Sequence, residues 1–178
     1  DAGLTCREAA IFRAYSKYFR QINLTFSENY IQETVLNNRE IAKNILELFR
    51  ARFCPVNHNV DLEVKLKTRI EGFLDKITNL DEDRILRKFL DVILATVRTN
   101  YFQKDSSGNF KDYISLKFDP TKIPDLVLPL PMYEIFVYSP RVEGVHLRGA
   151  KVARGGIRWS DRREDFRTEV LGLMKAQQ

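Results

Sequence analysis

Apolar residues recur at steps of three and four through the first hundred positions, which is the spacing of amphipathic helices packed on a common core. The first stripe spans residues 4–22, where Thr5 and Glu8 also fit a capping box at the start of a helix. We interpret its aromatic residues as helix core rather than as a stacking platform for a ligand (Phe12, Tyr15 and Phe19). Further helices are predicted after the cap Ser27, from the cap Asn38 to the Cys54–Pro55 pair, over 61–78, and from 80 to about 101.

The pattern changes after Gln103, where polar residues and a glycine predict a loop over 105–109. Alternating apolar and polar residues then predict strands at 113–118, 133–138, 142–148 and 152–159, the last interrupted by Gly155–Gly156. Prolines between the first two of these strands predict an extended linker (Pro120, Pro124, Pro129 and Pro131).

A closing helix is predicted from about Asp161, with Asp161 and Glu164 in capping positions. Its buried side is expected to carry the apolar residues Phe166, Val170, Leu171, Leu173 and Met174. The predicted fold class is therefore α+β, with about five helices followed by three or four strands and one helix.

Composition narrows the class of protein without naming a function. The chain has 178 residues, of which 44% are apolar and 30% charged, and these values exclude intrinsic disorder and a disulfide scaffold. Two cysteines, Cys6 and Cys54, form no metal-binding pattern and suit a reducing cytoplasm. Because the chain begins without methionine and stops within a helical pattern, we expect it to be an excerpt of a larger protein.

The net charge of +5 is concentrated near the end of the chain, since residues 141–178 hold nine basic and five acidic side chains. Within them, Gly155 and Gly156 stand at strand positions, where adjacent glycines permit close approach of a ligand or of another strand. Arg154 and Arg158 flank them and can bind a carboxylate or a phosphate. Two interpretations stay open: an anion-binding corner, or a glycine bulge with solvated arginines.

Other candidates are weaker. The alternating charges of 161–165 are typical of a solvated helix start, and His58 and His146 are isolated from any ligand partner. Glycine-rich dinucleotide and phosphate loops, zinc-protease and serine-hydrolase motifs are absent from the sequence. No nucleic-acid module is recognisable, and no apolar run is long enough to span a membrane.

The stretch PRVEGVHLRGAKVARGGIRWSDRREDFRTEVLGLMKAQQ at 140–178 resembles the start of the catalytic region of the large bacterial NAD-specific glutamate dehydrogenases. The resemblance extends upstream through residues 134–140, 116–120, 80–90 and 7–21 and so covers most of the chain. It implies a helical segment at 1–103, a loop, short strand and proline-rich linker at 104–131, and the truncated start of an α/β substrate-binding domain at 132–178.

The resemblance also implies which residues bind substrate. Arg154 takes the place of the family's lysine that holds the side-chain carboxylate of glutamate, while Gly155 and Gly156 let the backbone approach the ligand. Arg158 belongs to the same motif, but neither it nor His146 is assigned a role. The lysine that holds the α-carboxylate and the catalytic lysine are expected beyond Gln178, so no catalytic, cofactor-binding or metal-binding residue is expected in this chain.

The parent enzyme would convert L-glutamate to 2-oxoglutarate and ammonium with NAD, which a domain outside this chain would bind. The implied partners are this substrate pair, the remainder of the parent chain and further copies in a cytoplasmic homo-oligomer, without nucleic acid or membrane. The isolated chain is expected to be inactive. The alternative is a non-catalytic helical assembly or interaction module, in which the glycine–arginine corner is structural.

Overall fold

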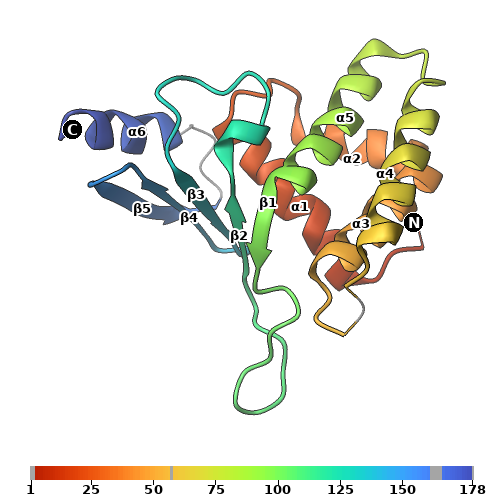
Figure 1. Cartoon of the computed structure of the whole chain (residues 1–178), viewed down its shortest axis with the longest axis horizontal. Coiled ribbons are helices and arrows are strands. Elements are labelled where there is room, and N and C mark those ends of the chain that lie inside the picture. Colours follow the sequence, from red (N-terminus) through yellow and green to blue (C-terminus); the bar gives the residue numbers. More distant parts are fainter. Residues whose placement is uncertain (1–2, 57, 161–165, 178) are drawn as a thin grey trace.

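A group of N-terminal helices lies beside an antiparallel sheet, and a last helix covers part of that sheet (Figure 1). The computed structural model describes residues 3–56, 58–160 and 166–177. The helices are α1 (Cys6–Gln21), α2 (Glu28–Asn37), α3 (Arg39–Phe53), α4 (Val60–Leu74), α5 (Leu80–Ala95) and α6 (Arg167–Lys175), with a short 3-10 helix η1 (Pro120–Lys122). The strands are β1 (Thr96–Thr99), β2 (Ile114–Phe118), β3 (Tyr133–Tyr138), β4 (Val142–Arg148) and β5 (Ala153–Trp159).

The helix starts are set largely by local side-chain caps. Thr5 accepts a hydrogen bond from the Glu8 N–H, and the Glu8 carboxylate accepts one from the Thr5 N–H, which confirms the predicted capping box. Ser27 caps α2 in the predicted way. The cap expected from the Asn38 side chain is wrong, because its amide instead donates to the Thr34 carbonyl and makes no capping bond to α3.

The fifth helix is shorter than its apolar stripe predicts, and the prediction that it reaches about residue 101 is wrong. It ends at Ala95, and the next four residues form β1 against β2. Thr96 and Val97 are β-branched and favour a strand, although they also continue the helical spacing. The sheet therefore has five strands within the described residues, rather than three or four.

The strands follow one another as a meander, in the order β1-β2-β3-β4-β5, and every neighbouring pair is antiparallel. The predicted bounds of 133–138 and 142–148 are confirmed. The predicted interruption at Gly155–Gly156 is wrong, as is the alternative of a glycine bulge. Gly155 pairs with His146 and Gly156 with Val145 in unbroken register along β5.

The core joins the helices to one face of the sheet. Tyr18 of α1 stacks on Phe118 of β2, with 4.3 Å between the ring centroids, and its ring also contacts Phe136 of β3. The aromatic stripe Phe12, Tyr15 and Phe19 is buried, which confirms its interpretation as helix core. Helices and sheet therefore share one apolar interior rather than packing as separate units.

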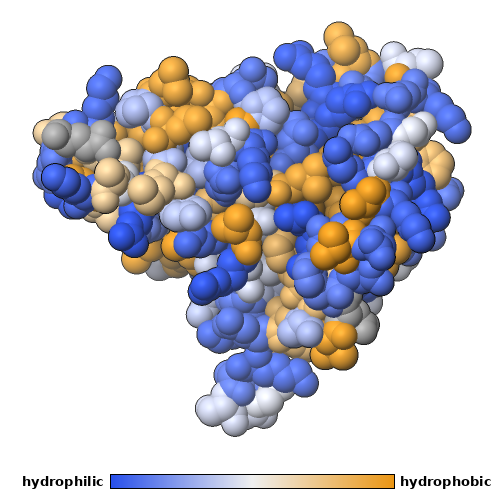
Figure 2. Space-filling model, viewed as in Figure 1, coloured by the Kyte–Doolittle hydropathy of each residue, from blue (hydrophilic) through white to orange (hydrophobic). Residues whose placement is uncertain are grey.

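Two segments extend from this core. The connection between β1 and β2 projects from the body, its residues 103–110 are exposed, and its tip is mainly hydrophilic (Figures 1 and 2). The proline-containing segment between β2 and β3 begins with η1 and buries Ile123, while Leu128 is exposed. Figure 2 shows apolar side chains gathered over this segment at the upper left.

The closing helix α6 is described from Arg167, and the predicted cap residues Asp161 and Glu164 lie outside the described residues. The predicted buried positions include Val170, Leu171 and Met174, all of which are buried. Leu173 is exposed, so its predicted burial is wrong. No helix in the described part of the chain has the length and apolar character needed to cross a membrane.

Candidate functional site

The glycine–arginine segment forms the edge strand β5, and its side chains alternate between the two faces of the sheet. Arg154, Gly156 and Arg158 share the face that packs against α6, because Phe166 lies beside both Gly156 and Arg158. Gly155 and Ile157 take the opposite, outer face. The two predicted glycines are therefore on different sides of the sheet.

The two glycines meet different surroundings. A Cβ atom at Gly155 would lie 2.8 Å from the Val145 carbonyl oxygen and 3.3 Å from the Cα of His146. At Gly156 the nearest atom to such a Cβ would be a ring carbon of Phe166 at 3.8 Å, an ordinary contact. Close approach of the neighbouring strand therefore accounts for Gly155, whereas only Gly156 lies on the face of Arg154.

The two arginines of the segment also differ. Arg158 donates to the Glu143 carboxylate at 3.5 Å and places its guanidinium 4.6 Å from the centre of the Phe166 ring. Arg154 is partly buried, and its Nη1 donates to the carbonyl of the adjacent Ala153 at 2.7 Å. Among residues 3–56, 58–160 and 166–177, no carboxylate pairs with Arg154. Its remaining guanidinium donors suit an added anion.

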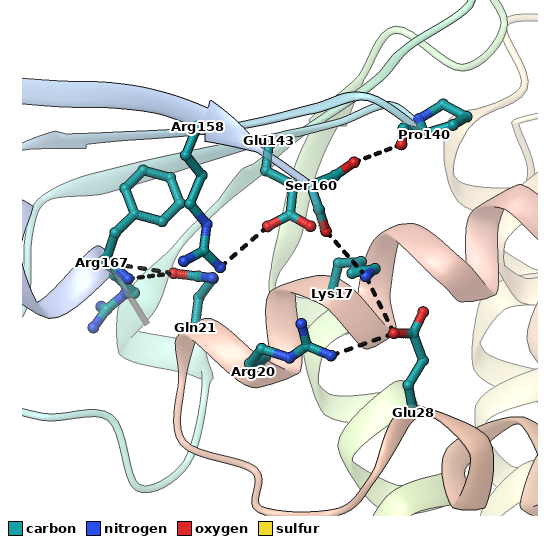
Figure 3. Close-up of polar contacts among 10 residues, drawn as sticks. Lys17, Arg20, Gln21, Glu28, Pro140, Glu143, Arg158, Ser160 and Arg167 are labelled. Atoms are coloured by element: carbon teal, nitrogen blue, oxygen red, sulfur yellow. Dashed lines mark hydrogen bonds and ion pairs between the residues drawn. The ribbon is translucent and has the colours of Figure 1, made fainter. Parts of the chain in front are cut away.

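Figure 3 shows the polar network beside this corner, where α1 meets the ends of β4 and β5. Glu143 exposes 1% of its side chain, and its Oε1 has no hydrogen-bond partner among the described residues. Burial raises the pKa of Glu143, and the positive charges of Lys17 and Arg158 oppose that rise. Lys17 itself ion-pairs with Glu28 of α2 at 3.1 Å.

Replacing Glu143 with glutamine should remove part of the pH dependence of stability. The folded-state pKa of this acid is raised, so above its ordinary pKa the unfolded chain loses the proton first and stability falls as pH rises. In Glu143→Gln the free energy of unfolding should decline less between about pH 4 and about pH 7, measured by urea denaturation. The exposed Glu33→Gln, with the same charge change, is the control; equal slopes in both variants would contradict the expectation.

Two depressions lie next to β5 in the described part of the chain. One open, apolar depression on the outer face is lined by residues that include Ile135, Val137 and Gly155, and another by Val142, Ile157 and Trp159. Arg154 lines neither of them. A binding site that includes Arg154 therefore needs lining residues other than those of these two depressions.

The described residues do not fit a bound NAD molecule. Dinucleotide sites use parallel strand–helix–strand units whose glycine-rich turn opens a helix. In the described part of the chain every strand pairing is antiparallel, and no such unit is present.

Two buried interactions near the corner were not predicted from the sequence. Arg167 of α6 forms a two-pronged ion pair with Glu134 of β3, at 2.7 Å and 2.9 Å. Gln21, the last residue of α1, accepts hydrogen bonds from two N–H groups at the start of α6. Glu134 could have been noticed as a charge at an inward position of an alternating strand, but its partner is 33 residues away.

Comparison with known families gives two matches along the chain. The family described as "Bacterial NAD-glutamate dehydrogenase, catalytic domain" matches residues 69–178. A second, described as "Glutamate dehydrogenase, helical motif 3", matches residues 1–55.

Individual relatives agree with these families. The NAD-specific glutamate dehydrogenase of Pseudomonas aeruginosa is 54% identical over 182 residues, which cover 99% of this chain and 11% of the relative. The enzyme of the same name from Mycobacterium tuberculosis is 47% identical over 181 residues, which cover 99% of this chain and 11% of that relative. That of Neurospora crassa is 26% identical over 145 residues, 75% of this chain and 13% of the relative. The chain thus spans about a tenth of the length of these relatives.

Proposed function

This chain belongs to the family of large bacterial NAD-specific glutamate dehydrogenases, and we propose that within a longer enzyme it supplies one wall of the glutamate site. The observation that carries the proposal is Arg154, a partly buried arginine on an edge strand with no carboxylate partner among the described residues. Arg158 and Arg167, by contrast, are held by Glu143 and Glu134. A dicarboxylic amino acid offers the carboxylate that Arg154 lacks.

In the parent protein the reaction would be the oxidation of L-glutamate to 2-oxoglutarate and ammonium, with NAD bound by a domain outside this chain. Arg154 would hold the side-chain carboxylate, and Gly156 would keep its face of β5 free of a side chain. Lysines expected beyond Gln178 would hold the α-carboxylate and assist the chemistry. On this proposal the isolated chain does not turn over glutamate, and the division at residues 1–103, 104–131 and 132–178 stays a prediction.

In the full-length enzyme, Arg154→Ala should raise the KM for glutamate by at least about tenfold, because a charge-assisted hydrogen bond to the substrate is lost. The KM for NAD should stay close to that of the wild type. Arg148→Ala on the neighbouring strand removes the same charge from an exposed position and should leave both constants nearly unchanged. Initial-rate kinetics with each substrate varied in turn measures these effects.

Two outcomes would contradict the proposal. Equal increases of both KM values would mean that Arg154 does not act on glutamate in particular. Unchanged kinetics together with altered oligomer assembly would favour the second candidate, a non-catalytic interaction module. The observation that favours this candidate is the exposure of Ile157 and Trp159, which leave 80% and 64% of their surface open on β5.

A further inference from the structure

Helix α6 begins, within the described residues, at an N-cap residue that cannot cap it through its side chain. Its N-cap residue is Phe166, whose ring cannot accept a hydrogen bond from the backbone, and no side-chain cap from this residue is present. The first N–H groups of any helix have no partner inside the helix, and leaving them unsatisfied in a buried place is costly. An acceptor from elsewhere in the fold can therefore support the start of α6.

Gln21 of α1 supplies that acceptor. Its Oε1 accepts hydrogen bonds from the N–H groups of both Phe166 and Arg167, each at 3.1 Å (Figure 3). Gln21 exposes only 1% of its surface, so water does not compete for these bonds. Its Nε2 has no hydrogen-bond partner in the described part of the chain, so the carbonyl oxygen makes the contacts that matter.

The helix that carries Gln21 is itself firmly placed. Tyr18, one turn earlier on α1, is fully buried between the helices and the sheet and stacks on Phe118. Lys17 donates to the carbonyl of Ser160, directly after β5, at 3.4 Å. The end of α1 is thus fixed to the sheet at several points. Through its hydrogen bonds, Gln21 holds the start of α6 in a defined position relative to α1.

The position of α6 bears on the face that holds Arg154. Phe166 lies beside Gly156 and beneath the Arg158 guanidinium, so a shift of the first turn of α6 would change the wall of this corner. Gln21 lies in the part of the chain that matches the helical motif, whereas Phe166 and Arg167 lie in the part that matches the catalytic domain. The contact therefore crosses the boundary between the two matched families.

We infer that Gln21 is a positioning residue through which the helical motif holds the glutamate-binding wall in place. This inference rests on the proposed function and gives the helical segment a task beyond packing. Gln21 touches no reacting atom; it acts through the backbone of α6. Its removal should consequently affect binding of glutamate more than binding of NAD.

The test uses the full-length enzyme and three variants. Gln21→Met removes the acceptor at similar volume and should raise the KM for glutamate by about three- to tenfold, without a matching change in the KM for NAD. Gln21→Glu keeps an acceptor at a helix N-terminus, where negative charge is favourable, and should restore a value near that of the wild type. Tyr15→Phe removes a buried hydrogen bond to Thr96 from the same helix, away from α6, and should not change the KM for glutamate.

Hydrogen exchange gives a second measurement that is independent of activity. In Gln21→Met, peptides covering residues 166–177 should exchange about tenfold faster at their first amides, and in Tyr15→Phe they should not. Unchanged exchange in Gln21→Met, or an equal rise of the glutamate KM in Tyr15→Phe, would overturn the inference. A wild-type enzyme that does not oxidise glutamate would instead overturn the proposed function, so the two failures are distinguishable.

Discussion

Replacing Glu134 with alanine is expected to lower the free energy of unfolding by about 3–5 kcal/mol, because the buried Arg167 guanidinium loses a carboxylate that accepts two of its hydrogen bonds. Glu134 and Arg167 expose 0% and 1% of their side chains, so water cannot take over the role of the carboxylate. Tyr18 lies near this pair, and burial raises the pKa of its phenol well above the usual range. The phenol therefore stays neutral and cannot replace the lost negative charge.

Denaturation in guanidinium chloride measures this loss of stability. Two further variants test its cause. Glu71→Ala breaks the exposed pair of Glu71 with Lys67 and should cost no more than about 0.5 kcal/mol. Replacing Glu134 with leucine and Arg167 with methionine together should restore most of the stability, because an apolar pair avoids the desolvation of both charges. If Glu134→Ala lowers the free energy of unfolding by less than about 1 kcal/mol, the expectation that this ion pair strongly stabilises the core is wrong.

The elements of the fold were predictable where local signals agree. The capping box at Thr5 and the alternation in 133–138 each specify one structure, and both predictions are confirmed. Thr96 and Val97 satisfy the helical spacing and the strand propensity at once, and only the pairing of β1 with β2 decides between them. That pairing joins residues about twenty positions apart, so no local pattern could reveal it.

The sequence indicates which residues form the candidate site, but it does not indicate how they are arranged. The types of Arg154, Gly155 and Gly156 indicate anion binding and close backbone approach, but their distribution over two sheet faces follows from the unbroken register of β5 with β4. The two adjacent glycines therefore differ in their surroundings: Gly155 makes room for the neighbouring strand, and Gly156 lies on the face of Arg154 beside Phe166. The supports of the corner, Gln21 and Glu134, act across the tertiary structure, because both contact Arg167, which is 146 and 33 positions away from them.

The helical motif and the start of the catalytic region share one hydrophobic core. Tyr18 and Gln21 of α1 contact the sheet and α6 respectively, and the buried apolar residues form one continuous cluster. Removing the helices would expose the inner face of the sheet and the start of α6 together. The helices therefore support the part of the sheet that carries the residues proposed to bind substrate.

The neighbouring glycines of β5 should respond in opposite ways to the same substitution. Gly155→Ala should lower the free energy of unfolding by about 1–3 kcal/mol, because the new Cβ would meet the Val145 carbonyl oxygen at 2.8 Å and backbone cannot move aside as a side chain can. Gly156→Ala should be neutral or stabilising by up to about 1 kcal/mol, because its Cβ makes only ordinary contact with Phe166 and alanine reduces the entropy of the unfolded chain.

Because the two variants differ by one position and carry the same added methyl group, they separate the structural use of glycine from its use in binding. Chemical denaturation should show the stability difference, and kinetics of the full-length Gly156→Ala enzyme should show a raised KM for glutamate despite an intact fold, since the methyl group enters the face of Arg154. Equal stability of the two variants would contradict the close approach of β4 at Gly155. An unchanged KM in Gly156→Ala would mean that glutamate does not approach β5 on this face, and the substrate wall would then have to be sought on the outer face beside Ile157.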